Sequence, residues 1–185
     1  MRPTIVLDPG HGASDPGAVY KGRRESDAAL EVALTLKTLL APAFTVKLTH
    51  IGNEPTDRLI PWPQRTNLPK ETGAVAFVSL HFNSVDAGGL VFYAGETTAG
   101  AERSRALAVA LDAAMPTSRR VASSVTAHAG WGRLFIDDVT TCPSVLIELD
   151  SINHAPPAGR LGRVARLGLV EPIAHVLIAR FGGHP

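Results

Sequence analysis

Three short apolar runs rich in β-branched residues limit what this chain can fold into. They read TIVL at residues 4–7, AVAFVSL at residues 74–80 and SVLIEL at residues 144–149. A continuous apolar run of this length is typical of a strand buried on both faces, as strands are in parallel sheets covered by helices. Further strands are expected at Phe44–Thr49 and Leu90–Tyr93, at Leu134–Ile136, and once within Pro116–Gly132, which is otherwise expected to be loop.

Helical patterns alternate with these runs. Apolar residues recur at helical spacing over Glu25–Leu40, Glu102–Met115 and Val170–Phe181. Ser26 or Asp27 is the candidate N-cap of the first helix. The segment Asp57–Lys70 contains three prolines, so we expect a broken helix or an ordered loop there. The sequence therefore predicts one α/β domain spanning residues 1–185, a mostly parallel twisted sheet of about six strands with helices on both faces.

Composition excludes several classes of function. The 185 residues carry a formal net charge of +1, so we expect no broad basic surface for nucleic acid or an anionic membrane. No run approaches the roughly 20 apolar residues of a membrane-spanning helix, and the first residues enter a strand with no signal-peptide pattern before it. The single cysteine, Cys142, rules out an intrachain disulfide and is expected to be a packing residue.

Four polar residues lie at or near the predicted carboxyl ends of strands, where sites form in open α/β sheets. His11 follows the first strand, His81 ends the 74–80 strand, Glu148 lies near the end of the 144–149 strand, and Glu25 opens the first helix. Two histidines and a carboxylate are a common ligand set for catalytic zinc, and a second carboxylate can serve as general base. Spacing alone does not establish a metal site, because the four residues form no compact motif. The alternative is that each side chain only forms a hydrogen bond with the backbone.

Other polar and aromatic residues have two possible roles each. His128, in the loop AHAGWG, is a candidate substrate contact or a residue that supports the site. Trp62 and Trp131 are expected in loops, where they could stack on a substrate or cap the core. The remaining histidines, His50, His154, His175 and His184, are expected to be surface or packing residues.

Three motifs carry a family resemblance. They are IVLDPGHGASDPGAVYKGRRESD (residues 5–27), SLHFNS (residues 79–84) and PSVLIELDSIN (residues 143–153). In this order and spacing the chain resembles the zinc-dependent N-acetylmuramoyl-L-alanine amidases of the Amidase_3 type, found in bacterial cell-wall hydrolases and phage endolysins.

The resemblance implies a reaction and a site. His11, Glu25 and His81 would bind zinc, and Glu148 would be the catalytic carboxylate. The expected reaction is hydrolysis of the amide between the lactyl group of N-acetylmuramic acid and L-alanine of the peptidoglycan stem peptide. Asn83 would hold its loop or touch substrate. Alternatives are a zinc carboxypeptidase or deacylase acting on another amide, and a non-catalytic wall-binding homologue.

The chain departs from the family pattern in two places. Asp150-Ser151 stands where the family usually has Gly-Phe, and only Ser84–Ala87 separates the SLHFNS motif from Gly88-Gly89. A long autoinhibitory helix, present in some members, therefore has no room, so we expect an uninhibited enzyme. Separately, we expect a monomer. We also expect no separate wall-binding domain. The absent signal peptide suits either a phage-type endolysin released from the host cytoplasm, or the catalytic domain of a longer exported protein that acts on the cell wall.

Overall fold

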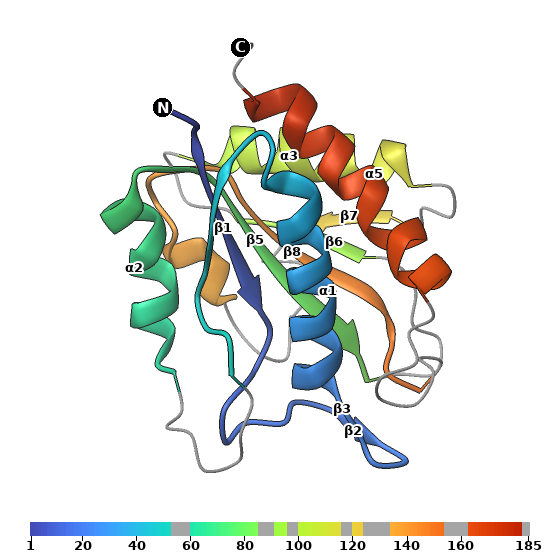
Figure 1. The fold of residues 1–185 in the computed structure, drawn as a ribbon. Helices are drawn as coiled ribbons and strands as arrows, with labels where there is room; N and C mark the ends of the chain where they lie inside the picture. Colours follow the sequence, from blue (N-terminus) through green and yellow to red (C-terminus); the bar gives the residue numbers. More distant parts are fainter. Residues whose placement is uncertain are drawn as a thin grey trace.

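The fold is a six-stranded sheet covered by helices on both faces (Figure 1). It is seen in a computed structural model, which describes residues 1–52, 60–84, 91–95, 100–115, 120–123, 134–153 and 163–182. The elements are β1 (Thr4–Pro9), β2 (Val19–Tyr20), β3 (Arg23–Arg24), α1 (Glu25–Leu40), β4 (Thr45–Leu48), α2 (Trp62–Thr72), β5 (Ala74–Asn83), β6 (Val91–Ala94), α3 (Ala101–Ala114), β7 (Arg120–Ser123), the 3₁₀ helix η1 (Phe135–Asp138), β8 (Ser144–Ser151) and α5 (Arg163–Phe181).

The sheet is mostly parallel, as predicted. Its strand order is β4-β1-β5-β8-β6-β7, and only the β6–β8 pair is antiparallel. Strands β1, β5 and β8 are adjacent and parallel, so their carboxyl ends lie side by side at one edge of the sheet. The loop after β1, His81 of β5 and Glu148 of β8 all lie at this edge, which is where the strand-end rule places a site.

Side chains of the central strands alternate between two apolar layers. In β5, Val78 and Leu80 pack toward α1, α3 and α5, whereas Phe77 packs toward α2 and η1. Both layers are buried, which explains why the strand sequences are continuously apolar rather than alternating. No helix in the described part of the chain is long and apolar enough to cross a membrane.

Three local predictions were wrong. The segment 57–70 was expected to be broken, but α2 runs without interruption from Trp62 to Thr72. Pro61 precedes the helix, and Pro63 lies in the first turn, where a missing N–H costs no helical bond. Pro69 lies inside the helix near its carboxyl end, where it is buried and removes one backbone hydrogen bond without breaking the helix.

The second correction concerns residues 134–136, which form no strand, because Leu134 is the N-cap of η1 and the next two residues are its first turn. A three-residue apolar run cannot distinguish a strand from a buried turn, and here the Asp137 N–H donates a hydrogen bond to the Leu134 carbonyl at 3.0 Å.

The third correction concerns the segment before α1, which contains the hairpin β2–β3. Its turn is Lys21-Gly22, with φ of 47° and 79°. Helix α1 begins directly at Glu25 after this hairpin, so neither Ser26 nor Asp27 is its N-cap.

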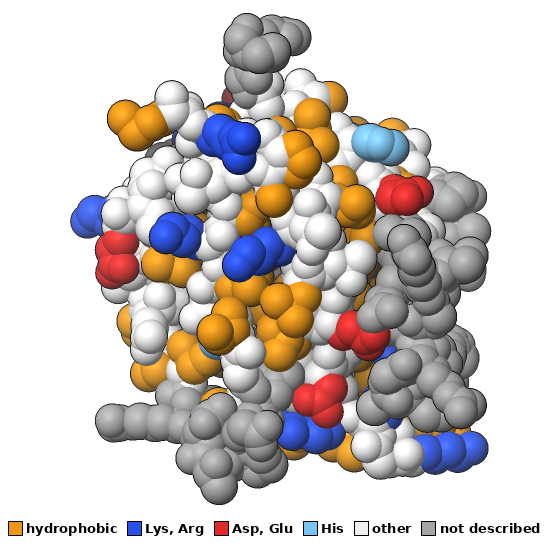
Figure 2. Space-filling model, viewed as in Figure 1, with side chains coloured by type: hydrophobic (Ala, Val, Ile, Leu, Met, Phe, Trp, Pro, Cys, Tyr) orange, Lys and Arg blue, Asp and Glu red, His pale blue; other side chains and the backbone are white. Residues whose placement is uncertain are grey.

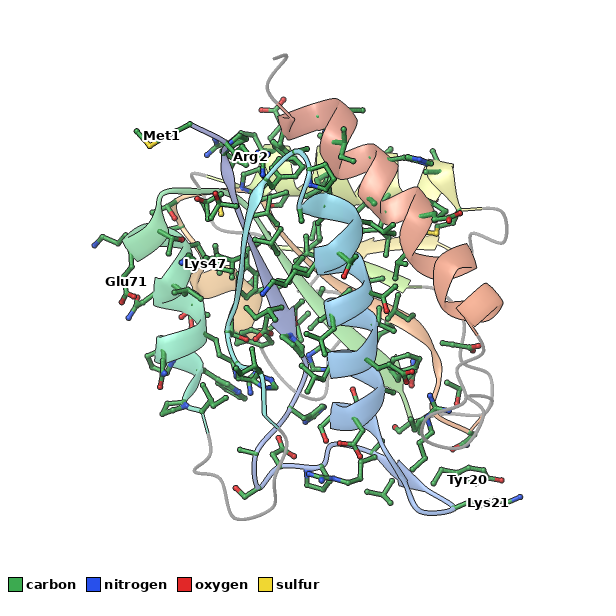
Figure 3. All side chains as sticks on the ribbon, in the orientation of Figure 1. Met1, Arg2, Tyr20, Lys21, Lys47 and Glu71 are labelled. Carbon is green, nitrogen blue, oxygen red and sulfur yellow. The ribbon has the colours of Figure 1, made fainter. Side chains whose placement is uncertain are left out.

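The surface carries both signs of charge. In the view of Figure 2, basic and acidic side chains are interspersed and form no continuous patch of one sign. At the tip of the hairpin, Tyr20 and Lys21 project outward, with the Lys21 ammonium 5.2 Å from the centre of the Tyr20 ring (Figure 3).

Candidate metal centre

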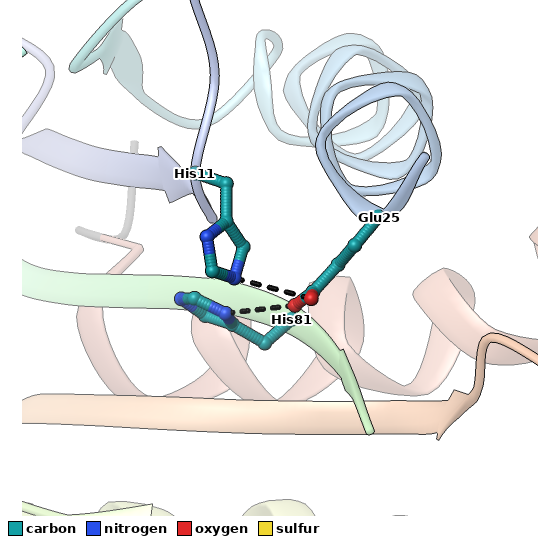
Figure 4. Close-up of side chains that lie close together, drawn as sticks. All are labelled: His11, Glu25 and His81. Carbon is teal, nitrogen blue, oxygen red and sulfur yellow. Dashed lines mark hydrogen bonds and ion pairs between the residues drawn. The ribbon is translucent and has the colours of Figure 1, made fainter. Parts of the chain in front are cut away.

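Three side chains from separate elements meet at the carboxyl edge of the sheet. His11 comes from the loop after β1, Glu25 from the first residue of α1, and His81 from β5. One ligand atom from each lies within 4.8 Å of the others (Figure 4). The structure thus brings together the three residues predicted to bind metal. Among the described residues, they form the one group of histidine and acidic side chains that could hold a metal ion.

Glu25 lies between the two histidines and uses both carboxylate oxygens. Its Oε2 is 3.1 Å from His11 Nε2, and its Oε1 is 3.0 Å from His81 Nδ1. Two backbone groups fix the carboxylate further, because Oε2 accepts the Ala18 N–H at 2.9 Å and Oε1 accepts the Phe82 N–H at 3.1 Å. Four contacts therefore hold this buried carboxylate. They come from the loop after β1, from β5, and from Ala18 just before the β2–β3 hairpin.

The loop after β1 turns sharply to present His11. His11 and Ala13 both have left-handed backbone conformations, with φ of 59° and 54°. Asp15 stabilises this turn, since Gly12 and Asp15 exchange two backbone hydrogen bonds at 2.9 and 3.0 Å. Asp15 Oδ2 also lies 2.9 Å from His11 Nδ1, which leaves His11 Nε2 directed at Glu25. A carboxylate on the remote ring nitrogen is the usual way a metal-binding histidine is oriented.

Two glycines leave room for the cluster. A Cβ on Gly10 would lie 2.5 Å from the His81 ring. A Cβ on Gly17, whose φ is +64°, would lie 2.5 Å from His11 Cδ2 and 2.7 Å from Glu25 Oε2. No side chain fits at either position without displacing a ligand, so both glycines in the motif serve the geometry of the site.

A buried ion pair anchors the same loop from the other side. Asp8 is fully buried and accepts hydrogen bonds from Thr49 Oγ1 at 2.6 Å, Ser79 Oγ at 2.7 Å and Arg65 Nη1 at 2.8 Å. Arg65, on α2, also donates to the backbone carbonyl of His11. The guanidinium therefore connects the centre of the sheet to the residue that carries the first imidazole.

Charges within the cluster shift the pKa of its members in opposite directions. Burial lowers the pKa of His11, but hydrogen bonds and charge from Glu25 and Asp15 outweigh it and raise the pKa to about 9. Burial raises the pKa of Glu25, but the two histidines outweigh it and hold that pKa far below its ordinary range. Without a metal ion, Glu25 is thus a carboxylate and His11 an imidazolium at neutral pH.

Glu148 lies beside the cluster. It is the register partner of His81 on the neighbouring parallel strand, so both side chains project from the same face of the sheet. Burial raises the pKa of Glu148 to about 7, with Glu25 adding to the effect and the histidines opposing it.

Two buried polar atoms at this place have no hydrogen-bond partner among the described residues, namely His81 Nε2 and Glu148 Oε2. Such an atom costs about 1–3 kcal/mol unless a bound group satisfies it. Two imidazoles, a fixed carboxylate and these two unsatisfied atoms therefore fit a centre that takes a metal ion with water or substrate.

The other predicted contacts have varied outcomes. The backbone carbonyl of Asn83 accepts the Ile152 N–H at 2.8 Å, which ties β5 to the turn after β8, while substrate binding by its side chain stays a prediction. At the unusual Asp150-Ser151 pair, Ser151 Oγ accepts the Asn153 N–H at 3.2 Å and its N–H donates to Asp150 Oδ1. His50 packs against the loop after β1, with Nε2 2.9 Å from the Pro9 carbonyl. His128 and Trp131 lie outside the described residues.

Sequence reasoning missed two residues of the site. Asp15 had a signal, because the second Asp-Pro-Gly repeats the turn chemistry of the first, but a turn role was sufficient to explain it. Arg65 had no such signal in the sequence, because a lone arginine in a proline-rich segment is normally interpreted as a surface charge.

Comparisons with known proteins show which family the chain resembles. Residues 5–162 match a family model described as N-acetylmuramoyl-L-alanine amidase. The chain is 38% identical over 80 residues to the sporulation-specific N-acetylmuramoyl-L-alanine amidase of Bacillus subtilis (strain 168), a match covering 43% of this chain and 31% of that protein. It is 27% identical over 162 residues to the amidase LytC of the same organism, covering 85% of this chain and 31% of that one. The chain thus spans about a third of the length of these curated relatives.

Solved structures share the fold. The catalytic domain of CwlV, an N-acetylmuramoyl-L-alanine amidase from Bacillus (Paenibacillus) polymyxa var. colistinus, superposes with a TM-score of 0.74 at 24% identity, covering 96% of this chain and 97% of that one. An N-acetylmuramoyl-L-alanine amidase from Clostridium difficile 630 also gives 0.74, at 20% identity, with 96% of each chain covered.

Proposed function

This chain belongs to the N-acetylmuramoyl-L-alanine amidase family, and we propose that it hydrolyses the amide between the lactyl group of N-acetylmuramic acid and L-alanine in peptidoglycan, with zinc as its metal. One observation carries the proposal: Glu25 lies between His11 and His81 in a cluster of metal-binding geometry, at the strand edge that also carries Glu148.

The donor set supports zinc as the bound ion. His11, Glu25 and His81 offer two imidazole nitrogens and a carboxylate oxygen, and three protein ligands are what a catalytic zinc site provides. Zinc bound there supplies a Lewis acid that polarises the reacting carbonyl and lowers the pKa of water to about 7. Asp15 and the backbone donors on Glu25 hold the ligands before the ion arrives, which reduces the reorganisation that binding requires.

Glu148 is proposed as the general base and then the general acid. A pKa of about 7 suits both roles, because the carboxyl can take a proton from the attacking water and release it again at neutral pH. Its buried Oε2 has no partner among the described residues, so a bound water or the leaving nitrogen of alanine would satisfy it. Proton delivery to that nitrogen is needed for the amide bond to break.

We propose that the site needs no segment of this part of the chain to be removed before it acts. Strand β5 ends at Asn83 and β6 begins at Val91, so the connection between them is residues 84–90. A connection this short is too small for a long helix that could cover the metal centre.

Product analysis on purified peptidoglycan tests the function. The proposal requires release of N-terminal L-alanine on intact stem peptides with no new reducing sugar ends, from zinc-loaded protein. A Glu148→Gln protein prepared in parallel serves as the control for contaminating hydrolases. New D-amino-acid carboxyl ends would indicate a carboxypeptidase, loss of acyl groups a deacylase, and wall binding without cleavage a non-catalytic homologue. Any of these results contradicts the proposal.

A further inference from the structure

Trp62 leaves a large aromatic surface open to solvent, two ring contacts away from the candidate metal centre. It is the first residue of α2 and is 65% exposed. One side of its indole stacks on Phe135 of η1, with ring centres 6.1 Å apart and planes 24° from parallel. The sequence placed Trp62 in a loop with two possible roles, and the structure gives it a packed inner side and an exposed remainder.

Phe135 connects Trp62 to the cluster. Its ring centre lies 6.5 Å from that of His81, and it packs edge-on against the buried Phe77 at 6.4 Å. Helix α2 is itself fixed by the Arg65–Asp8 ion pair, three residues after Trp62. The two aromatic rings therefore form a preorganised surface that leads outward from a metal ligand, on the face of the sheet that also carries Glu148.

We propose that Trp62 and Phe135 form a stacking subsite for a pyranose ring of the peptidoglycan glycan strand; this rests on the proposed amidase function. The amino sugars of peptidoglycan have equatorial ring substituents, so each ring presents a flat face of axial C–H bonds. That face carries partial positive charge and complements the negative face of an aromatic ring.

The position of the subsite favours sugar over stem peptide. The lactyl carbonyl is joined to its sugar only through a methine carbon and an ether oxygen, so the glycan must lie directly beside the metal centre. Two ring-to-ring contacts, of 6.5 and 6.1 Å, join His81 to Phe135 and Phe135 to Trp62, so this aromatic pair begins at a proposed metal ligand. A stem peptide, with its carboxylates and amino groups, offers no flat apolar face to match.

Binding of glycan that lacks stem peptides tests the subsite without any hydrolysis. In the Glu148→Gln protein, the affinity for oligosaccharides of alternating N-acetylglucosamine and N-acetylmuramic acid is measured by calorimetry, and Trp62→Ala should lower it about threefold to tenfold. Trp62→Phe keeps a ring and should retain most of the affinity. Val109→Ala removes an exposed apolar side chain from α3, on the other face of the sheet, and should leave the affinity unchanged.

The subsite would be contradicted if Trp62→Ala bound glycan as its parent does, or if the parent bound no glycan. It would also be contradicted if the loss appeared with a sugar-free stem peptide instead. Failure of the amidase proposal can be distinguished from failure of the subsite proposal. A protein that binds glycan through Trp62 but releases no N-terminal L-alanine would contradict only the amidase proposal. A protein that releases them and binds glycan independently of Trp62 overturns only the subsite.

Discussion

His81 and Glu148 are register partners on the adjacent parallel strands β5 and β8. Partners in register project from the same face, so the sheet itself places a proposed metal-binding imidazole beside the proposed general base. A rigid sheet fixes this relationship better than two loops could, because each strand is buried on both faces and cannot shift register without exposing its apolar side chains.

Glu148→Gln should greatly slow turnover and preserve metal binding. The amide has the shape of the carboxylate but takes no proton, so kcat on peptidoglycan fragments should fall about 10²–10⁴-fold. Metal content measured by elemental analysis should stay the same. Glu71→Gln, an exposed carboxylate on α2, is the matched control and should be as active as the parent. Retained activity in Glu148→Gln would assign the proton transfer to another group.

Removing metal should destabilise the protein and eliminate activity together. Zinc at a thousandfold excess over its dissociation constant stabilises by about 4 kcal/mol, so a chelator should lower the melting temperature and added zinc should restore it. Thermal unfolding with and without chelator measures this. The variant His81→Ala provides the control, since its melting temperature should respond little to zinc.

Gly17→Ala should weaken metal binding more than backbone strain alone explains. Its new Cβ would meet both His11 and Glu25, and disturbing the groups that orient metal ligands costs about 10–100-fold in affinity. Gly22→Ala is a matched control, because Gly22 has a similar positive φ of +79° with nothing within 4 Å of the added atom. Titration with zinc should separate the two variants, and equal affinities would show that only strain matters.

Arg65→Met should destabilise the fold strongly. Loss of the guanidinium leaves the fully buried Asp8 carboxylate without its ion-pair partner, which costs about 3–5 kcal/mol. Denaturant unfolding of the metal-free protein gives the value. Arg2→Met, which removes an exposed hydrogen bond to the Ala41 carbonyl, should change stability by less than about 0.5 kcal/mol. Similar small losses in both variants would contradict the anchoring role.

The metal-free protein should lose stability as pH rises from about 6.5 to 9. The folded pKa of His11 is raised from 6.5 to about 9, so its protonation stabilises the fold fully below 6.5 and no longer above 9. The loss should amount to at most about 3 kcal/mol. Unfolding curves across this range measure it, and His11→Gln should remove the dependence. Zinc affinity should rise over the same range, because binding displaces the proton. A pH-independent metal-free stability would contradict the raised pKa.

The sequence by itself determined the layered fold and the candidate ligands. Continuous apolar runs in β1, β5 and β8 require burial on both faces, and that requirement predicts a parallel sheet with polar residues exposed only at strand ends. His11, His81 and Glu148 stand at those ends, and the motifs around them carry the resemblance that assigned their roles.

Only the tertiary structure decided how these residues act together. Spacings of 14, 56 and 67 residues between the four polar residues contain no distance information, and the adjacency of β1, β5 and β8 arises from pairing between distant segments. For the same reason, the sequence could not predict the roles of Asp15, Arg65 and the Trp62–Phe135 stack. A hydrogen bond or ring contact depends on positions in space to within a fraction of an ångström, whereas local sequence specifies propensities of single segments. The continuous helix α2 illustrates this most directly, because the folded protein buries Pro69 within it although proline locally favours a break.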